Sequence, residues 1–244
     1  MKLISPQYFY YFADKVWPYV GGLSLLLMSL GLFLGLFVSP ADYQQGDGFR
    51  IIYIHVPAAF LSLGIYSMIF ICSVIYLIWR IKIADIIALS SASIGAIFTL
   101  VALLTGAIWG KPMWGTWWVW DARLTSELIL LFLYCGYMGL RSAFTDIQLS
   151  ARAGGILAIV GMIDIPIVHF SVEWWQTLHQ GATLTKFAKP SMDFSMLYPL
   201  YILIVALALF YLTMLLLRSS TEILSRERDT DWVKSLVNSW VERI

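Results

Sequence analysis

The stretch FSMLYPLYILIVALALFYLTMLLL, residues 194–217, decides the class of fold, because it contains no charged side chain. A helix that crosses the hydrocarbon core of a bilayer needs about 20 predominantly apolar residues. The stretch meets that length, so the sequence predicts a spanning helix here.

Five further runs are uncharged or nearly so and have a similar length. They cover residues 16–41, 51–79, 86–110, 128–145 and 153–172, with Arg141 interrupting the fourth and Asp164 the fifth. The chain is 60% hydrophobic and 13% charged, whereas a soluble domain has about 25% charged residues. The first run exceeds the apolar core of a cleavable signal peptide, so we expect it to be retained.

These runs predict an all-α integral membrane protein that forms a single domain over residues 1–244. We expect six transmembrane helices at about 18–38, 52–79, 86–108, 127–146, 153–172 and 195–217. The formal net charge of +1 indicates neither a nucleic acid nor an acidic substrate as partner. The cysteines, Cys72 and Cys135, lie inside apolar runs and form no metal-binding spacing.

The distribution of basic residues predicts the orientation. With a cytoplasmic N-terminus the inner side carries eleven Lys and Arg residues and the outer side five. The inner set is Lys2, Lys15, Arg80, Lys82, Arg141, Arg152, Arg218, Arg226, Arg228, Lys234 and Arg243, and the outer set is Arg50, Lys111, Arg123, Lys186 and Lys189. The positive-inside rule therefore favours cytoplasmic N and C termini.

The tail, residues 219–244, differs from the rest of the chain. Apolar side chains recur in it at helical spacing, namely Trp232, Val233, Leu236, Val237, Trp240, Val241 and Ile244. Polar residues, including Asp231, Lys234 and Glu242, fall on the other face. This pattern predicts an amphipathic helix that lies on the inner leaflet of the membrane lipid or docks on a cytoplasmic partner.

A tryptophan-rich segment, WGKPMWGTWWVWDARLT at residues 109–125, follows the third predicted helix on the outer side. It contains five tryptophans and ends in Asp121 and Arg123; the tryptophans are Trp109, Trp114, Trp117, Trp118 and Trp120. An interfacial aromatic belt accounts for one or two of them in a loop. Five, interleaved with glycine and proline, favour a platform for a flat apolar ligand.

Helix boundaries around this segment follow from local signals. We expect Gly110, Pro112 and Gly115 to end the third helix and open the tryptophan segment. Thr125 or Ser126 is the expected cap of the fourth helix, with Glu127 in its first turn.

All three histidines map to the outer side. His55 lies near the outer end of the second predicted helix, His179 in the last outer loop, and His169 at a helix end. A histidine at a membrane boundary is often a structural hydrogen-bonding group. Two on separate elements beside a tryptophan platform instead point to axial ligands of haem iron. His169 fits a structural role better.

Haem also carries two carboxylates. Arg123 can bind one of them through two parallel hydrogen bonds. The alternative is a local salt bridge of Arg123 with Asp121 or Glu127. Asp121 is expected to orient Arg123 or a tryptophan N–H. Asp164, an acid inside an apolar run, fits a structural role, and no chain of charged residues is expected to cross the bilayer.

Three motifs give the chain a family resemblance: WGTWWVWDARLTSE at 114–127, YIHVPAA at 53–59 and VEWWQTLHQG at 172–181. The first resembles the WWD signature of haem-handling membrane proteins. Together, over nearly the whole chain, they resemble the cytochrome c maturation protein C family. The resemblance implies a haem-delivery subunit rather than an enzyme, located in the bacterial inner membrane.

The same resemblance implies the ligand, its contacts and the partners. Haem b is held on the periplasmic face with His55 and His179 as axial ligands of its iron. The WWD segment forms the haem-contacting surface. Haem then passes to a periplasmic haem chaperone, the E protein. The ABC transporter subunits A and B and a small membrane protein, D, complete the complex.

Two other classes of function remain as alternatives. A redox subunit that carries haem b would usually place both histidines on facing helices, whereas His179 is expected in a loop. A secondary transporter predicts polar or broken helices near the midplane, and the predicted helices are apolar there. No metalloprotease, P-loop or catalytic-triad spacing is present in the sequence.

Overall fold

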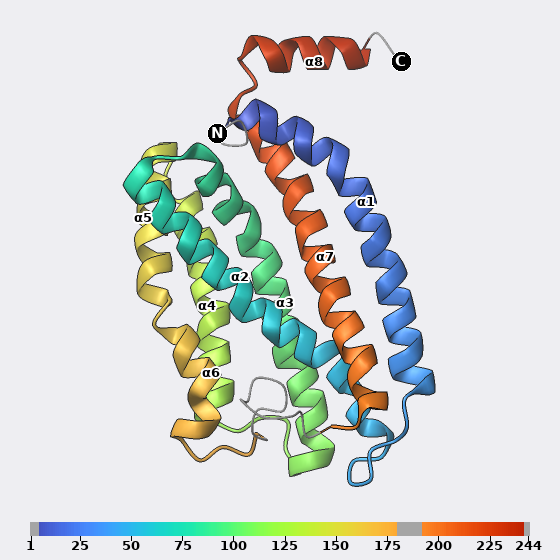
Figure 1. Cartoon of the computed structure of the whole chain (residues 1–244). Coiled ribbons are helices and arrows are strands. Elements are labelled where there is room, and N and C mark those ends of the chain that lie inside the picture. Colours follow the sequence, from blue (N-terminus) through green and yellow to red (C-terminus); the bar gives the residue numbers. More distant parts are fainter. Residues whose placement is uncertain (1–4, 180–191, 242–244) are drawn as a thin grey trace.

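The computed structural model of the chain describes residues 5–179 and 192–241, and the described part is helical (Figure 1). Its elements are, in chain order, α1 (Pro6–Phe33), η2 (Leu34–Val38), η3 (Asp47–Ile51), α2 (Ile52–Trp79), α3 (Lys82–Trp114), α4 (Ala122–Ser142), α5 (Ile147–Gly161), α6 (Asp164–Trp174), α7 (Phe194–Arg226) and α8 (Asp231–Val241). Some residues on which the predicted orientation and the amphipathic tail depend lie outside the described residues, namely Lys2, Lys186, Lys189, Glu242, Arg243 and Ile244.

Six stretches of the described chain are long and apolar enough to cross a membrane, as the sequence predicts. They are Pro6–Val38, Asp47–Trp79, Lys82–Trp114, Ala122–Ser142, Ile147–Trp174 and Phe194–Arg226. α1 packs along α7, and α2 packs along α3, while α4, α5 and α6 complete the other side of the bundle (Figure 1). The all-helical multi-pass fold is therefore confirmed.

The two ends of the chain lie at the same end of the bundle (Figure 1). α8 lies beyond that end, and its Trp232 packs on Tyr10 of α1 with ring centroids 5.6 Å apart. The Trp232 Nε1–H also donates to Glu227 at 2.7 Å. The amphipathic tail is thus attached to the bundle through a tryptophan on its apolar face.

Several helices extend beyond their expected bounds, and α7 continues to Arg226 instead of ending near residue 217. α1 begins at Pro6 rather than near residue 18, with proline in the first turn, where its missing N–H costs no hydrogen bond. α3 continues through Gly110 and Pro112 to Trp114, so these two residues do not end the helix as expected. Gly115, with φ +77°, ends it, because glycine adopts the left-handed conformation without steric cost.

The fifth span is broken into two helices, whereas the sequence predicted one continuous helix over residues 153–172. α5 ends at Gly161 and α6 begins at Asp164. The Met162 carbonyl accepts from Ile165 N at 3.2 Å, and Pro166 has no N–H to continue the α-helical pattern onto that carbonyl. The break places Asp164, which is buried, in the first turn of α6.

The cap of α4 is Asp121 rather than the expected Thr125 or Ser126. Asp121 has extended backbone angles, and its Oδ1 accepts from Leu124 N at 2.8 Å. Ser126 lies within the helix, where its hydroxyl donates to the Ala122 carbonyl at 2.6 Å. The aspartate that closes the tryptophan-rich segment therefore also starts the next span.

Buried charges lie at the end of the bundle that carries the termini. Both terminal nitrogens of Arg141 on α4 donate hydrogen bonds to the Asp85 carboxylate on α3. Arg226 Nη1 on α7 donates to Asp85 Oδ2 at 2.7 Å. Arg226 also pairs with Glu222 at 2.6 Å. A buried ion cluster with matched partners thus joins three helices at this end of the bundle.

Candidate functional site

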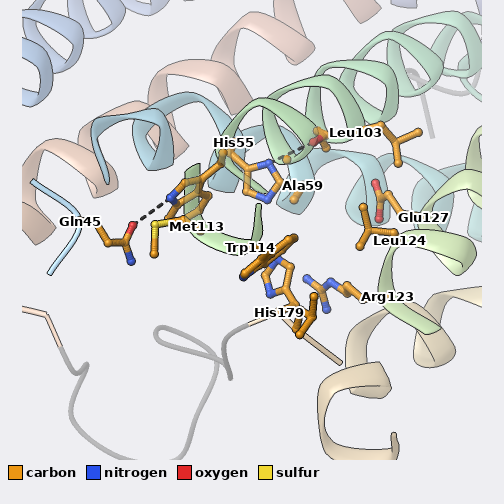
Figure 2. A pocket seen from close by; sticks show the side chains of 14 residues that line it. Gln45, His55, Ala59, Leu103, Met113, Trp114, Arg123, Leu124, Glu127 and His179 are labelled. Carbon is orange, nitrogen blue, oxygen red and sulfur yellow. Dashed lines mark hydrogen bonds between the residues drawn. The ribbon is translucent and has the colours of Figure 1, made fainter. Parts of the chain in front are cut away.

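A cavity of about 90 Å³ is lined by the side chains drawn in Figure 2. The helix ends that form it lie at the end of the bundle opposite α8 (Figure 1). The cavity is lined by the first turn of α2, the last turns of α3, the start of α4 and the loop after α6. The lining residues are Gln45, His55, Ala59, Ala102, Leu103, Gly106, Trp109, Met113, Trp114, Arg123, Leu124, Glu127, Leu178 and His179.

His55 is fixed by two hydrogen-bonding groups of α3. Its Nδ1 lies 3.1 Å from the Ala102 carbonyl oxygen and 3.0 Å from Thr105 Oγ1. A carbonyl oxygen can only accept, and the Thr105 hydroxyl donates to the Val101 carbonyl at 2.6 Å. Nδ1 therefore carries the proton, and Nε2 keeps a lone pair. This arrangement is typical of a metal-binding histidine whose ring is oriented by its other nitrogen.

His179, from the loop after α6, meets His55 at the same cavity (Figure 2). The two ring centroids are 6.3 Å apart, and the ring planes are inclined by 34°. The two residues are far apart in the chain, so the fold alone brings them together. The Trp114 ring lies 6.1 Å from His179.

Trp109 is a second aromatic wall, packed edge-on against His55 at 5.8 Å. Its Nε1–H donates to Gln45 Oε1 at 2.9 Å, which fixes the indole in place. Gln45, Met113 and Glu127 also line the cavity, and the sequence interpretation missed them as site residues. Glu127 is an acid at the start of an apolar run, which is a signal for function.

The predicted tryptophan platform divides into two parts. Trp114 lines the cavity, whereas Trp117, Trp118, Trp120 and Asp121 are not among the described residues that line it. Trp117 and Trp120 are 57% and 76% exposed, and Trp118 packs edge-on to Trp120 at 5.4 Å. These rings form an exposed aromatic surface beside the cavity.

Two polar atoms of this segment are buried without a hydrogen-bond partner among the described residues: Trp118 Nε1 and Asp121 Oδ2. The other oxygen of Asp121 is used for the helix cap. Buried polar groups are normally paired. Both atoms therefore keep hydrogen-bonding capacity that no described residue uses.

Arg123 lies at the cavity on the side of α4 and α6 (Figure 2). Its Nη1 donates to the Val168 carbonyl of α6 at 2.8 Å. Within the described ranges, no ion pair joins Arg123 to Asp121 or Glu127, so the salt bridge considered as the alternative is not formed there. Arg123 instead connects two helices and keeps further N–H groups for a ligand.

His169 does not line the cavity in the described part of the structure. Its ring packs edge-on against Phe170, with centroids 4.6 Å apart. This is compatible with the structural role expected for it.

The donor set at the cavity restricts the kind of ligand. Over residues 5–179 and 192–241, no group of three or more His, Cys, Asp or Glu side chains is placed to hold a metal ion. Two imidazoles suffice only for a metal that brings its remaining ligands with it. The aromatic walls and Arg123 suit a flat, apolar, metal-containing ligand with acidic groups.

Comparisons with known proteins show the family. A family model described as "Heme exporter protein C" matches residues 1–234. Heme exporter protein C of Haemophilus influenzae is 49% identical over 235 residues, 96% of both chains. Heme exporter protein C of Escherichia coli K12 is 46% identical over 236 residues, 97% of this chain and 95% of the relative.

A more distant relative comes from a liverwort. The putative cytochrome c biosynthesis ccmC-like mitochondrial protein of Marchantia polymorpha is 41% identical over 213 residues, covering 87% of this chain and 90% of the relative. The similarity therefore extends over nearly the full length of chains from bacteria and from a plant organelle.

Proposed function

Because the chain belongs to the heme exporter protein C family, we propose that it binds haem at the cavity between His55 and His179 and delivers it to a partner in cytochrome c maturation. The names of the relatives support haem as the cargo and cytochrome c biosynthesis as the process. The chain acts in this proposal as a delivery subunit and not as an enzyme.

The observation that carries the proposal is the pairing of the two histidines. An imidazole nitrogen lies about 2 Å from its metal, which puts the centres of two axial rings on one iron roughly 6 Å apart. The His55 and His179 centroids are 6.3 Å apart. The proton on His55 Nδ1 leaves Nε2 as the ligand atom.

The size of the cavity supports presentation rather than storage. Pockets that enclose a ligand of drug size have volumes of roughly 300–1,000 Å³, whereas this cavity has about 90 Å³. A porphyrin with its iron between the histidines must therefore project from the cavity onto the exposed rings of Trp117 and Trp120. An exposed edge is what a receiving partner needs, since free haem is too insoluble to diffuse between proteins.

Arg123 is the residue we assign to a haem propionate, because it is the cation that lines the cavity in the described part of the chain. Its guanidinium is already oriented by the Val168 carbonyl, so little freedom is lost when a carboxylate binds. Trp118 and Asp121 belong in this proposal to the haem-contacting or partner-contacting surface.

The setting we propose is the bacterial inner membrane, with cytoplasmic termini and a periplasmic site. The excess of Lys and Arg at the end that carries the termini supports this orientation. The proposed cargo is haem b and the receiving partner is the periplasmic haem chaperone, or E protein. The ABC transporter subunits A and B and the small D protein are the other proposed partners.

The first experiment tests the ligands. The full-length protein is purified with haem, and we expect a six-coordinate low-spin optical spectrum. His55→Gly and His179→Gly should each lose haem or change the spectrum, and added imidazole should restore it in part. His169→Ala is the matched control and should retain the wild-type spectrum. If neither glycine variant differs from wild type, the ligand assignment is wrong.

A secondary transporter is the second candidate, and the broken fifth span beside the buried Asp164 favours it. The two functions differ in where haem goes. Delivery predicts that haem leaves the protein when the apo-chaperone is added. Transport predicts that haem crosses the membrane of vesicles that contain this protein alone.

A further inference from the structure

Glu127 is a buried carboxyl at the cavity, and binding of iron by the two histidines does not require it. It is 8% exposed, it lines the cavity from the second turn of α4, and its Oε1 accepts from Ser62 Oγ on α2 at 2.8 Å. Figure 2 shows it beside Leu124, on the same side of the cavity as Arg123. Burying a carboxyl within a membrane-spanning bundle is costly, so a buried acid such as Glu127 is a candidate functional residue.

The position of Glu127 relative to the iron follows from α2. His55, Ala59 and Ser62 lie on one face of that helix at four-residue and three-residue spacing, and His55 and Ala59 line the cavity. Ser62 is two turns beyond His55, a rise on the order of 10 Å. Because Ser62 holds the Glu127 carboxyl, that group lies about this far from the ligand position.

Glu127 is the acid that lines the cavity in the described part of the chain, opposite in charge to Arg123. Arg123 precedes it by one turn on the same helix, and Asp164 of α6 is within electrostatic range. The other polar groups near it are Ser62 and Tyr134, whose hydroxyl donates to the Ser62 carbonyl at 2.7 Å. Arg123 forms no ion pair with Glu127 among the described residues, and its Nη1 donates to the Val168 carbonyl.

A ferric porphyrin core carries one positive charge, whereas the ferrous core is neutral. A charge difference of this kind is felt strongly in a poorly solvated site. We propose that Glu127 makes the site selective for the oxidised, cationic form of haem over the reduced, neutral form. The inference rests on the proposed haem site and adds to it a residue that determines which form of the cargo is held.

The test uses the full-length protein loaded with haem. Glu127→Gln keeps the size of the side chain and an oxygen for Ser62 but removes the charge. We expect the preference for ferric over ferrous haem to fall about tenfold, which is a rise of about 59 mV in the midpoint potential of the bound haem. Affinity for zinc protoporphyrin, whose core is neutral, should change by less than about twofold.

Three further variants separate charge from structure. Glu127→Asp keeps the charge and should keep the potential near that of wild type. Glu173→Gln removes an exposed acid of α6 and should leave the potential unchanged. Ser62→Ala removes the donor that stabilises the charged carboxylate, so it should favour the neutral acid and raise the potential, in the same direction as Glu127→Gln. If Glu127→Gln does not fold, Ser62→Ala still decides the matter.

The outcomes distinguish this inference from the proposed function. If the wild-type protein binds no haem, the proposed function is wrong. If haem binds normally and the potential is the same in wild type, Glu127→Gln and Ser62→Ala, haem delivery stands and the role of Glu127 is refuted. Equal losses of ferric haem and zinc protoporphyrin in Glu127→Gln would also refute it, because they indicate a structural defect.

Discussion

Thr105, together with the Ala102 carbonyl, fixes the tautomer and the rotation of the His55 ring. Its hydroxyl oxygen accepts from His55 Nδ1 at 3.0 Å and its O–H donates to the Val101 carbonyl. Groups that orient a metal-binding histidine from behind are typically worth about 10–100-fold in metal affinity. Substitution of Thr105 therefore tests how much this support of His55 contributes to haem binding.

We expect Thr105→Val to weaken haem binding by about tenfold, because the β-branched shape is kept and the hydroxyl is lost. Thr105→Ser keeps the hydroxyl and should bind haem like wild type. Equilibrium titration with haem, followed by absorbance, measures both. Equal affinity in the valine and serine variants would show that the ring is fixed without Thr105.

Trp114 and Trp117 have different positions in spite of the shared motif. Trp114 contacts His179 at the cavity, whereas Trp117 is 57% exposed. We expect Trp114→Ala to reduce haem retention by about two- to tenfold, since an aromatic pair contributes about 0.5–1.5 kcal/mol beyond its buried area. Trp117→Ala should lose less haem than Trp114→Ala, because its ring is exposed and outside the cavity, and should slow haem transfer to the apo-chaperone.

Retention and transfer are measured separately, by the spectrum after gel filtration and by the haem found on the chaperone. The double variant Trp117→Ala/Trp120→Ala should lose more transfer than the single variant. Normal transfer by a correctly inserted double variant would remove the exposed tryptophans from the proposed surface.

Arg123 and Asp121 are adjacent in the sequence motif but have separate contacts. Arg123 donates to Val168 of α6, and Asp121 caps α4. Arg123→Lys should weaken haem binding, because a lysine cannot reproduce the planar, two-pronged contact with a carboxylate. Asp121→Asn should bind haem nearly like wild type, because asparagine is an equally good helix cap.

The haem affinities of the two single variants and the double variant test this separation. We expect the affinity of the double variant to equal that of Arg123→Lys, within about 0.5 kcal/mol. A full defect in Asp121→Asn alone would instead mean that Asp121 acts on the ligand or on Arg123.

At the scale of the elements, close approach of helices depends on a few glycines. A methyl group on Gly95 of α3 would collide with the Tyr134 ring of α4, whereas one on Gly139 of α4 would meet nothing within 4 Å. We expect Gly95→Ala to destabilise the protein by about 1–3 kcal/mol through overpacking. Gly139→Ala should be neutral or stabilising by about 1 kcal/mol.

Thermal unfolding in detergent measures both alanine variants. The difference between them isolates the packing of α3 against α4, because both lie in helices and gain the same methyl group. A Gly95→Ala protein as stable as Gly139→Ala would show that Tyr134 moves aside without cost.

At the scale of the whole molecule, the ion cluster joins α3, α4 and α7 at the end that carries the termini. Arg141 and Asp85 have side chains that are 4% and 3% exposed. Removing one partner of such a pair leaves an uncompensated buried charge and typically costs about 3–5 kcal/mol. The cluster is therefore expected to hold the bundle together at this end.

We expect Arg141→Gln to lower thermal stability strongly and Arg228→Gln to leave it unchanged. Arg228 pairs with Asp229 at 3.5 Å, but both side chains are at least 79% exposed, and exposed pairs contribute about 0–1 kcal/mol. Unfolding temperatures in the same detergent compare the two. Equal temperatures would mean that the cluster contributes nothing to stability.

The sequence by itself determined that the chain is helical and crosses the membrane six times. Long runs such as 194–217 have one stable form in lipid, since a helix alone satisfies every backbone group within its own segment. It also predicted the chemical character of the site, because histidines, tryptophans and an arginine gathered near the ends of predicted spans are unusual enough to indicate a ligand. Composition and local spacing carry this information without reference to contacts.

Only the tertiary structure decided which of those residues meet. It placed His55 opposite His179 and made Asp121 a cap while Arg123 reaches Val168. It also brought Glu127 to the cavity, broke the fifth span beside Asp164, and buried Asp85 against Arg141. These outcomes depend on how helices that are distant in the chain pack against one another. The apolar pattern of one segment cannot predict which segments will be its neighbours in space.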